Sequence, residues 1–265
     1  MFGLFGCNTK KKDFVFDKFK AGIEKHGLKV DSVDSEGFLH VSKGELDLKI
    51  SLENARRNYE RDSDETHISD LVETVISYSP ELPDWETAKK DIYINLFPND
   101  FDFGEFIHSK ITDELSKVYV HSDDGKFSWI SKDDIRKWNV TKPELDKQAH
   151  QNASVMLNKS PITFDTIENR KLGMINAEHE SLKGALLFAP NFKDKVLKDF
   201  GFPFYAVIPA RDFCYIFSEK DFDFFSGRLG KTVVREYKES GYPITTEILK
   251  ITDKGVEAVG KYSTE

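Results

Sequence analysis

The segment Phe204-Tyr-Ala-Val-Ile-Pro-Ala-Arg-Asp-Phe-Cys-Tyr-Ile-Phe217 contains two apolar runs separated by a short polar break. β-Branched and aromatic residues dominate both runs, which is typical of neighbouring strands in the interior of a sheet. Proline is tolerated at the break because a turn needs no backbone donor there. We therefore predict a hairpin, formed by residues 204–208 and 213–217, at the centre of the core.

Patterns on both sides of this hairpin predict further short hairpins and helices. Thr141 and Glu144 have the spacing of a capping box, which marks the start of a helix. Apolar residues recur with helical spacing between Phe222 and Tyr237. Strands are expected at residues 28–30, 37–41, 45–52, 91–96, 117–121, 126–130, 162–167, 171–175, 244–252 and 256–261, and helices at 13–26, 66–76, 141–156, 191–200 and 222–237.

These elements predict an α+β fold in which mostly antiparallel sheets, built from short hairpins, are covered by helices. A chain of 265 residues forms one large domain or two smaller ones. We expect a flexible N-terminal segment at residues 1–12, an N-terminal α+β region at 13–116 and a C-terminal α+β region at 117–265. Alternative places for the boundary are residues 80–90, where prolines occur, and the neighbourhood of residue 139.

The composition is that of a soluble globular protein with a heavily charged surface, because 39% of the residues are hydrophobic and 32% are charged. A net charge of −8 argues against nucleic-acid binding, which requires a concentrated basic face. The 22 phenylalanines predict aromatic packing in the core, and exposed ones would form an adhesive surface.

Cys7 and Cys214 are too few for a disulfide framework or a structural zinc site, so we expect no metal and a reducing, cytoplasmic environment. No apolar stretch is long enough to span a bilayer. The start of the chain resembles a lipoprotein signal at Cys7 but has no basic n-region and too short an apolar region, which leaves the role of Cys7 open. Phe2, Leu4 and Phe5 are candidates for a weak peripheral contact with lipid.

Two segments share parts of known ligand-binding motifs but depart from them. Gly227-Arg-Leu-Gly-Lys-Thr232 ends like a phosphate-binding loop, yet the leading position is Phe225 and helical spacing runs through it. Asp100-Phe-Asp-Phe-Gly-Glu105 has part of the carboxylate spacing of a calcium loop, yet Ile111 occupies the position of the bidentate ligand. We therefore expect neither nucleotide nor calcium, and no other cofactor is predicted.

Arg211 and Asp212 are the charged residues at the break of the central hairpin, where flanking strands would hold them rigidly. Two interpretations are open: the two residues pair with each other or satisfy the turn, or they belong to a binding site. His179, which lies between two glutamates, is a further candidate binding residue because carboxylates raise the basicity of histidine. No catalytic residue is assigned.

Several phrases of the C-terminal half resemble the YtpQ-like family of uncharacterised bacterial proteins. They are Trp138-Asn-Val-Thr141, Ala185-Leu-Leu187, Ala206-Val-Ile-Pro-Ala-Arg-Asp212 and Tyr242-Pro-Ile-Thr245. The third phrase is the most distinctive. The resemblance implies a cytoplasmic bacterial α+β protein and carries over no catalytic residue.

We expect a non-catalytic cytoplasmic protein that binds another protein or a small ligand through an aromatic-lined groove. The absence of catalytic motifs and the excess of phenylalanine favour this hypothesis. The alternative hypothesis is an enzyme of unrecognised type that uses Arg211 and Asp212, together with His179 or His150.

Overall fold

The computed structural model describes residues 13–44, 46–78, 81–123, 126–177 and 180–265 and divides the chain into two compact units. Unit 1 comprises residues 1–79 and unit 2 comprises residues 80–265. This division differs from the boundary expected between residues 116 and 117, which would cut strand β6 (Leu115–Asp123), and it lies at the edge of the alternative region 80–90. Because every residue of β4 (Ile92–Pro98) pairs with β6, both sides of the expected boundary share one sheet.

The N-terminal segment 1–12 lies outside the described residues. The expectations for Cys7 and for lipid contacts by Phe2, Leu4 and Phe5 fall within that segment. Among the described residues, no helix has the length and apolar character required to cross a membrane.

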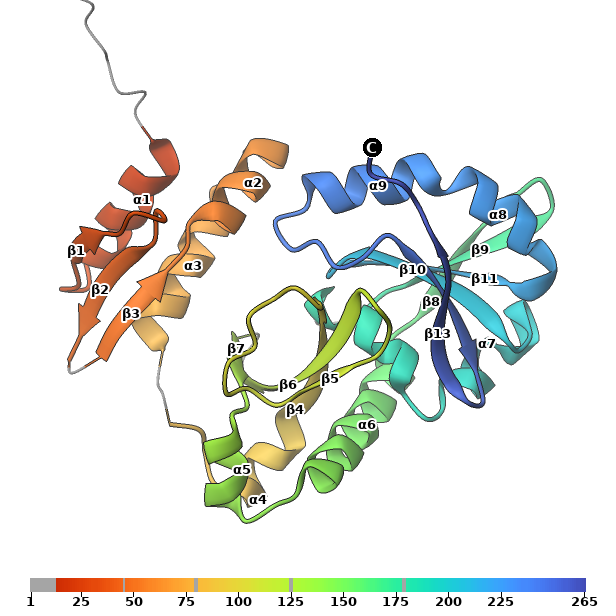
Figure 1. Ribbon diagram of the computed structural model, residues 1–265, viewed down its shortest axis with the longest axis horizontal. Helices are drawn as coiled ribbons and strands as arrows, with labels where there is room; N and C mark the ends of the chain where they lie inside the picture. Colours follow the sequence, from red (N-terminus) through yellow and green to blue (C-terminus); the bar gives the residue numbers. More distant parts are fainter. Residues whose placement is uncertain (1–12, 45, 79–80, 124–125, 178–179) are drawn as a thin grey trace, which may run out of the picture. The chain divides into compact units, whose positions relative to one another are not determined.

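Unit 1 is a three-stranded antiparallel sheet, in the order β1-β2-β3, accompanied by helices (Figure 1). The helices α1 and α3 approach closely at Gly22, where a Cβ atom would lie 2.6 Å from a methyl group of Val72. Phe19, Ile23 and Val41 are fully buried in the core of this unit. The elements are α1 (Phe14–Glu24), β1 (Val30–Val33), β2 (Leu39–Lys43), β3 (Leu46–Ile50), α2 (Glu53–Asp62) and α3 (Thr66–Ser77).

Helix α2 has no counterpart among the sequence predictions. Its sequence, Glu-Asn-Ala-Arg-Arg-Asn-Tyr-Glu-Arg-Asp, is almost entirely polar, and only Ala55 and Asn58 are buried. Such a segment has no apolar stripe with helical spacing, which is the signal that revealed α1 and α3.

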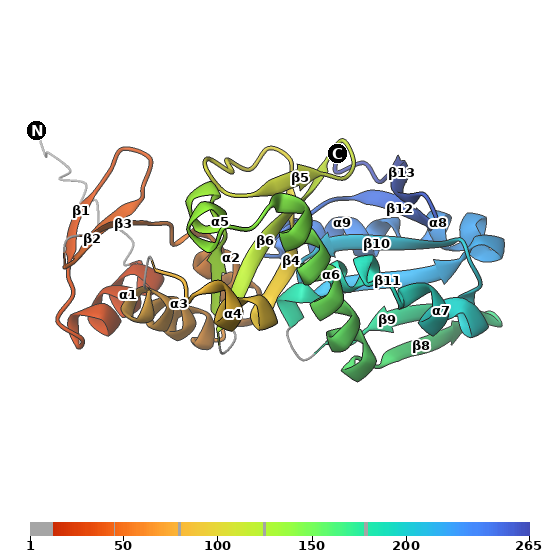
Figure 2. The same cartoon turned by 90° about the horizontal axis from the view of Figure 1, so that it is seen from below.

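The larger sheet of unit 2 is six-stranded and antiparallel, in the order β13-β12-β10-β11-β9-β8 (Figures 1 and 2). The predicted hairpin, β10 and β11, occupies its centre, and every residue of β10 is buried. Helices α8 and α9 pack on one face, whereas α7 and the second sheet of this unit contribute to the core on the other. The elements are β8 (Ile162–Ile167), β9 (Arg170–Ile175), α7 (Phe192–Phe200), β10 (Phe204–Ala210), β11 (Phe213–Ser218), α8 (Phe222–Arg228), α9 (Gly230–Glu239), β12 (Glu247–Thr252) and β13 (Gly255–Lys261).

The smaller sheet of unit 2 is four-stranded, and β6 pairs with each of the other three strands, β4, β5 and β7. Helix α6 packs against β4, and the capping box of Thr141 and Glu144 at its start is present as predicted. The remaining elements are α4 (Trp85–Ala88), β5 (His108–Lys110), β7 (Lys126–Trp129), α5 (Lys132–Trp138) and α6 (Lys142–Lys159). The predicted α+β class, with antiparallel sheets of short hairpins covered by helices, is therefore confirmed.

Candidate functional site

Arg211 and Asp212 form the turn of the central hairpin. Ala210 pairs with Phe213, so the turn contains these two residues instead of the expected four-residue break. The register of the hairpin shifts before Ala210, and this irregularity accommodates Pro209, which has no backbone N–H to donate. The hairpin therefore brings the Arg211 side chain to the end of the most deeply buried strand.

The guanidinium of Arg211 contacts two aromatic rings. Its Cζ atom is 4.5 Å from the ring centre of Phe97 and 4.4 Å from that of Tyr242. The backbone N–H of Arg211 also donates to the carbonyl of Tyr242 at 3.2 Å. Because contacts with two rings restrict a planar guanidinium, this group is held in place although it belongs to a turn.

No hydrogen bond or ion pair links this guanidinium to another described residue, and its Nε atom is buried without a partner. The two terminal nitrogens also lack a protein partner, but they are not among the buried unpaired atoms and therefore reach solvent. Burial lowers the pKa of Arg211 to about 10, so the side chain remains positively charged at neutral pH.

A narrow hollow lies beside Arg211. Asn95 and Ser181 contribute polar groups to its wall, and Ile208 and Ile244 contribute apolar ones. The side-chain oxygen of Asn95 accepts the backbone N–H of the following residue at 2.8 Å. The hollow has no room for a water molecule, so water cannot supply the acceptor that the Nε atom lacks.

The other residues predicted for the site are not brought together with Arg211. Asp212 is exposed, and no ion pair joins it to Arg211. His179 lies outside the described residues. His150 belongs to helix α6, where its Nε2 atom is 3.5 Å from a carboxylate oxygen of Asp146.

His150 and Asp146 form a compact polar cluster with two side chains of β6. The ammonium group of Lys117 and the hydroxyl of Tyr119 both contact the Asp146 carboxylate. Burial opposes ionisation of Asp146, but the contacts with Lys117 and Tyr119 outweigh it and lower its pKa. Burial lowers the pKa of His150, which favours the neutral form of this histidine. The cluster ties α6 to the smaller sheet with its charges compensated internally.

A larger cleft of about 620 Å³ opens elsewhere in unit 2, and we call it the acidic cleft. It is lined by the loop after β4, the loop before β6, α9 and the segments around β12 and β13. Its charged and aromatic lining residues are Asp100, Asp113, Glu114, Glu265, Lys261, Tyr237 and Tyr262. Carboxylates therefore outnumber basic side chains in this wall by four to one.

The carboxylates of the acidic cleft differ in their partners. Glu114 is 2.7 Å from the ammonium of Lys261, and Asp113 is 2.7 Å from that of Lys110. Neither the side chain of Asp100 nor that of Glu265 makes a hydrogen bond or ion pair with a described residue. Two uncompensated negative charges thus remain in the cleft.

Polar contacts fix the rim of the acidic cleft. The side-chain amide of Asn99 donates to the carbonyls of Thr112 and Asp113, each at 2.8 Å, which ties the loop after β4 to the loop before β6. Behind the rim, the buried carboxylate of Glu247 accepts a hydrogen bond from the hydroxyl of Thr112 at 2.5 Å. The cleft is therefore built on ordered backbone.

Tyr262 closes one side of the acidic cleft against α9. A Cβ atom at Gly230 would lie 3.0 Å from its ring, so glycine allows the ring to pack directly on the helix. Burial raises the pKa of Tyr262 to about 12, and its hydroxyl is buried without a hydrogen-bond partner. The Gly227–Thr232 segment is thus divided between α8 and α9 and does not follow a strand as a phosphate-binding loop does.

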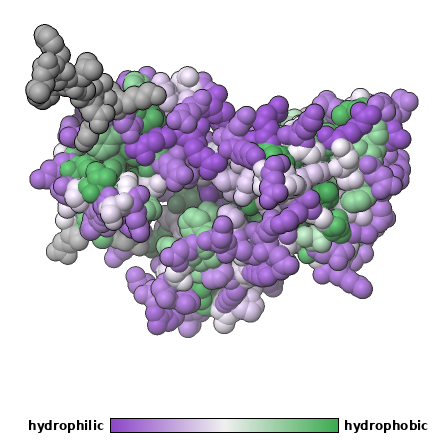
Figure 3. Space-filling view, turned by 45° about the horizontal axis from the view of Figure 1, so that its top comes forward, coloured by the Kyte–Doolittle hydropathy of each residue, from purple (hydrophilic) through white to green (hydrophobic). Residues whose placement is uncertain are grey.

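An aromatic group surrounds Trp129 next to Phe97. The ring centres of Phe97 and Trp129 are 4.5 Å apart, and Phe101 lies 5.1 Å from each of them. Phe101 is 44% exposed and Phe106 is 38% exposed. On the face shown in Figure 3, hydrophobic residues form small patches among hydrophilic ones. Phe101 and Phe106 are therefore the exposed members of this aromatic group.

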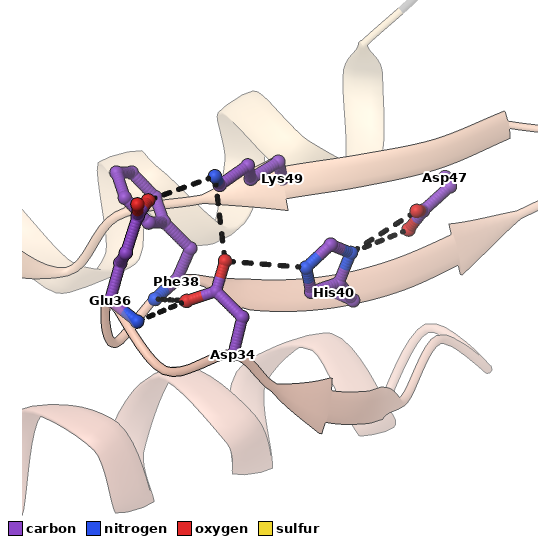
Figure 4. A network of polar contacts seen from close by, with 6 residues as sticks. All are labelled: Asp34, Glu36, Phe38, His40, Asp47 and Lys49. Carbon is purple, nitrogen blue, oxygen red and sulfur yellow. Dashed lines mark hydrogen bonds and ion pairs between the residues drawn. The ribbon is translucent and has the colours of Figure 1, made fainter.

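Unit 1 has a polar network of its own on its sheet, shown in Figure 4. Asp34 accepts the backbone N–H groups of Glu36 and Phe38, both at 2.9 Å, and lies 3.4 Å from the ammonium of Lys49. His40 stands between two carboxylates, 3.6 Å from Asp34 and 3.1 Å from Asp47. Every charged member of this network has a partner, which indicates that it stabilises the hairpin.

Sequence patterns missed the acidic cleft, because its lining comes from five separate parts of the chain. Asp100 belongs to the segment that was compared with a calcium loop. In the structure, Asp102 of that segment accepts the N–H of Gly104 at 3.1 Å and stabilises a turn. Within the described part of the chain, no group of three or more metal-ligating side chains is close enough to hold a metal ion.

Comparisons of the chain with protein-family profiles, curated proteins and solved structures find no match. The similarity of the C-terminal half to the YtpQ-like family therefore stays a prediction.

Proposed function

We propose that this protein is a non-catalytic binding protein that takes a cationic small molecule in the acidic cleft. The observation that carries the proposal is a ligand-sized cleft in which Asp100 and Glu265 have no cationic partner. A volume of about 620 Å³ lies within the range of small-molecule sites in proteins. A cationic ligand would supply the missing partners for both carboxylates.

The rest of the lining supports the same ligand class. Tyr237 and Tyr262 provide aromatic surface, which attracts ammonium and guanidinium groups. The net charge of −8 attracts cations to the protein and repels anions at long range. Lys261 is held by Glu114 at 2.7 Å, so its charge is already compensated. A cation is therefore favoured over an anion in this cleft.

The alternative of an enzyme that uses Arg211, Asp212 and His150 has less support. General acid–base catalysis needs a titratable group within hydrogen-bond reach of the reacting atom. The contacts of His150 are made with Asp146 and Lys117, and none joins it to Arg211 or Asp212. A cytoplasmic location also remains part of the proposal, and the free, buried thiol of Cys214 supports it.

Calorimetric titration with spermidine, at low ionic strength, tests the proposed function. We expect saturable binding to the wild-type protein. Asp100→Asn should weaken it by about two- to fivefold, because one exposed charge contact contributes about 0.2–1 kcal/mol. Lys261→Gln should strengthen it, since it removes the single basic side chain among the residues that line the cleft.

Glu257→Gln is the matched control, because Glu257 is an exposed carboxylate of β13 that does not line the cleft. It changes the net charge by the same amount as Asp100→Asn. If Glu257→Gln weakens binding as much as Asp100→Asn does, or if binding is not saturable, the ligand is attracted by overall charge and the proposal is wrong. Wild-type affinity in both Asp100→Asn and Lys261→Gln would also contradict it.

A further inference from the structure

The Arg211 side chain is an unusual feature of unit 2, because it combines rigid placement with missing partners. The Cζ atom of the guanidinium lies 4.5 Å from the ring centre of Phe97 and 4.4 Å from that of Tyr242. Arg228 provides a contrast, since it also stacks on a ring, that of Phe224 at 4.3 Å, but is paired with Glu168 at 2.7 Å. Stacking alone therefore does not prevent an arginine from finding a carboxylate in this fold.

A cationic side chain that is largely removed from water lowers the stability of the fold when its N–H groups have no hydrogen-bond acceptor. The Nε atom of Arg211 is buried without a partner, and the adjacent hollow is too small for a water molecule. The two terminal nitrogens have no acceptor among the described residues and are not completely buried. The edge of an unpaired guanidinium can donate two parallel hydrogen bonds. The two oxygens of a carboxylate or phosphate have the spacing to accept them.

We propose that Arg211 is the anchor of a second binding site, one that takes the carboxylate of a small organic acid. The aromatic rings orient the guanidinium before the ligand arrives, so binding needs little further ordering. Asp212 follows Arg211 directly and is exposed, and its negative charge penalises a doubly charged phosphate more than a singly charged carboxylate. This site differs from the acidic cleft in the sign of the ligand charge, so each is tested separately.

NMR titration of the wild-type protein with benzoate tests the inference without relying on any variant. The side-chain nitrogen resonances of arginine report directly on a new acceptor. We expect the Arg211 resonances to shift and saturate, and those of Arg228 to stay in place because Glu168 already occupies its edge. Parallel, unsaturated shifts at both arginines would show a general salt effect and overturn the proposal, as would the absence of any shift.

Inorganic phosphate is the second probe. A saturable shift of Arg211 with phosphate and none with benzoate would overturn the assignment to carboxylates. Arg211→Lys should weaken benzoate binding by about tenfold, because an ammonium group cannot form the paired hydrogen bonds of a guanidinium. Asp212→Asn should strengthen it by about two- to threefold, because a nearby like charge is removed. Unchanged affinity in both variants contradicts the proposed anchor.

Discussion

The two units of this protein bury their sheets in different ways. Strand β10 of unit 2 is buried at every position, because helices and the second sheet cover both of its faces. Strand β3 of unit 1 alternates, with Leu48 turned inward and Lys49 exposed. In unit 2 the central strands are therefore buried on both faces. In unit 1 one face of the sheet carries polar side chains.

The units also treat charge differently. In unit 1, the side chains of Asp34, His40 and Lys49 compensate one another at the surface. In unit 2, Arg211 lies at the end of a buried strand with no acceptor. Charged residues beside apolar strands can thus complete turns or remain unsatisfied, and the unsatisfied ones are the candidates for ligand binding.

The largest difference is expected for core truncations in the two sheets. Phe204 is fully buried in β10 and stacks on Phe192, so Phe204→Ala should cost about 3–5 kcal/mol of unfolding free energy. Leu48→Ala in β3 removes a side chain that is only partly buried, and we expect a loss of about 1 kcal/mol. Urea unfolding of both variants measures the difference. Equal losses would show that the second covered face of β10 adds nothing.

A smaller difference is expected when the charged groups are removed. Asp34→Ala takes away the acceptor of two backbone N–H groups and should lower the urea midpoint of unfolding. Arg211→Met replaces an unpaired guanidinium by an apolar side chain, and the midpoint should stay unchanged or rise. A clear drop for Arg211→Met would mean that its ring contacts stabilise the fold more than its missing acceptors cost.

The smallest effects are expected in the pH dependence, and they have opposite signs in the two units. Neighbouring Asp47, with Asp34, raises the pKa of His40 above 6.5, whereas burial lowers the pKa of His150 below it. The contribution of His40 to the free energy of unfolding is complete below pH 6.5 and is lost as the pH rises through the folded-state pKa of His40. The contribution of His150 to the free energy of unfolding is complete above pH 6.5 and is lost as the pH falls through the folded-state pKa of His150.

NMR titration of the two histidine signals measures their pKa values. The urea midpoints of His40→Gln and His150→Gln, followed as a function of pH, measure the effects on stability. Each variant should lose the corresponding pH dependence and keep the other. Titration of the two histidines at the same pH would contradict the difference between an exposed network and a partly buried cluster.

Local signals in the sequence determined most of the elements of unit 2. Strand β8 has the predicted bounds 162–167, the capping box of Thr141 and Glu144 starts α6, and the apolar hairpin of residues 204–217 lies at the centre of the larger sheet. These features depend on side-chain spacing and on hydrogen bonds between residues close in sequence. The same dependence explains why polar α2 gave no signal.

Tertiary structure alone decided the division of the chain and the surroundings of the charged groups. The contacts of Arg211 with Phe97 and Tyr242, and the convergence of Asp100, Glu114 and Tyr262 on one cleft, join segments that are far apart in the sequence. Periodicity shows which face of an element is buried but carries no information on which distant side chain will face it. Whether a charged side chain has a compensating partner depends on that distant side chain, so only the tertiary structure decides it.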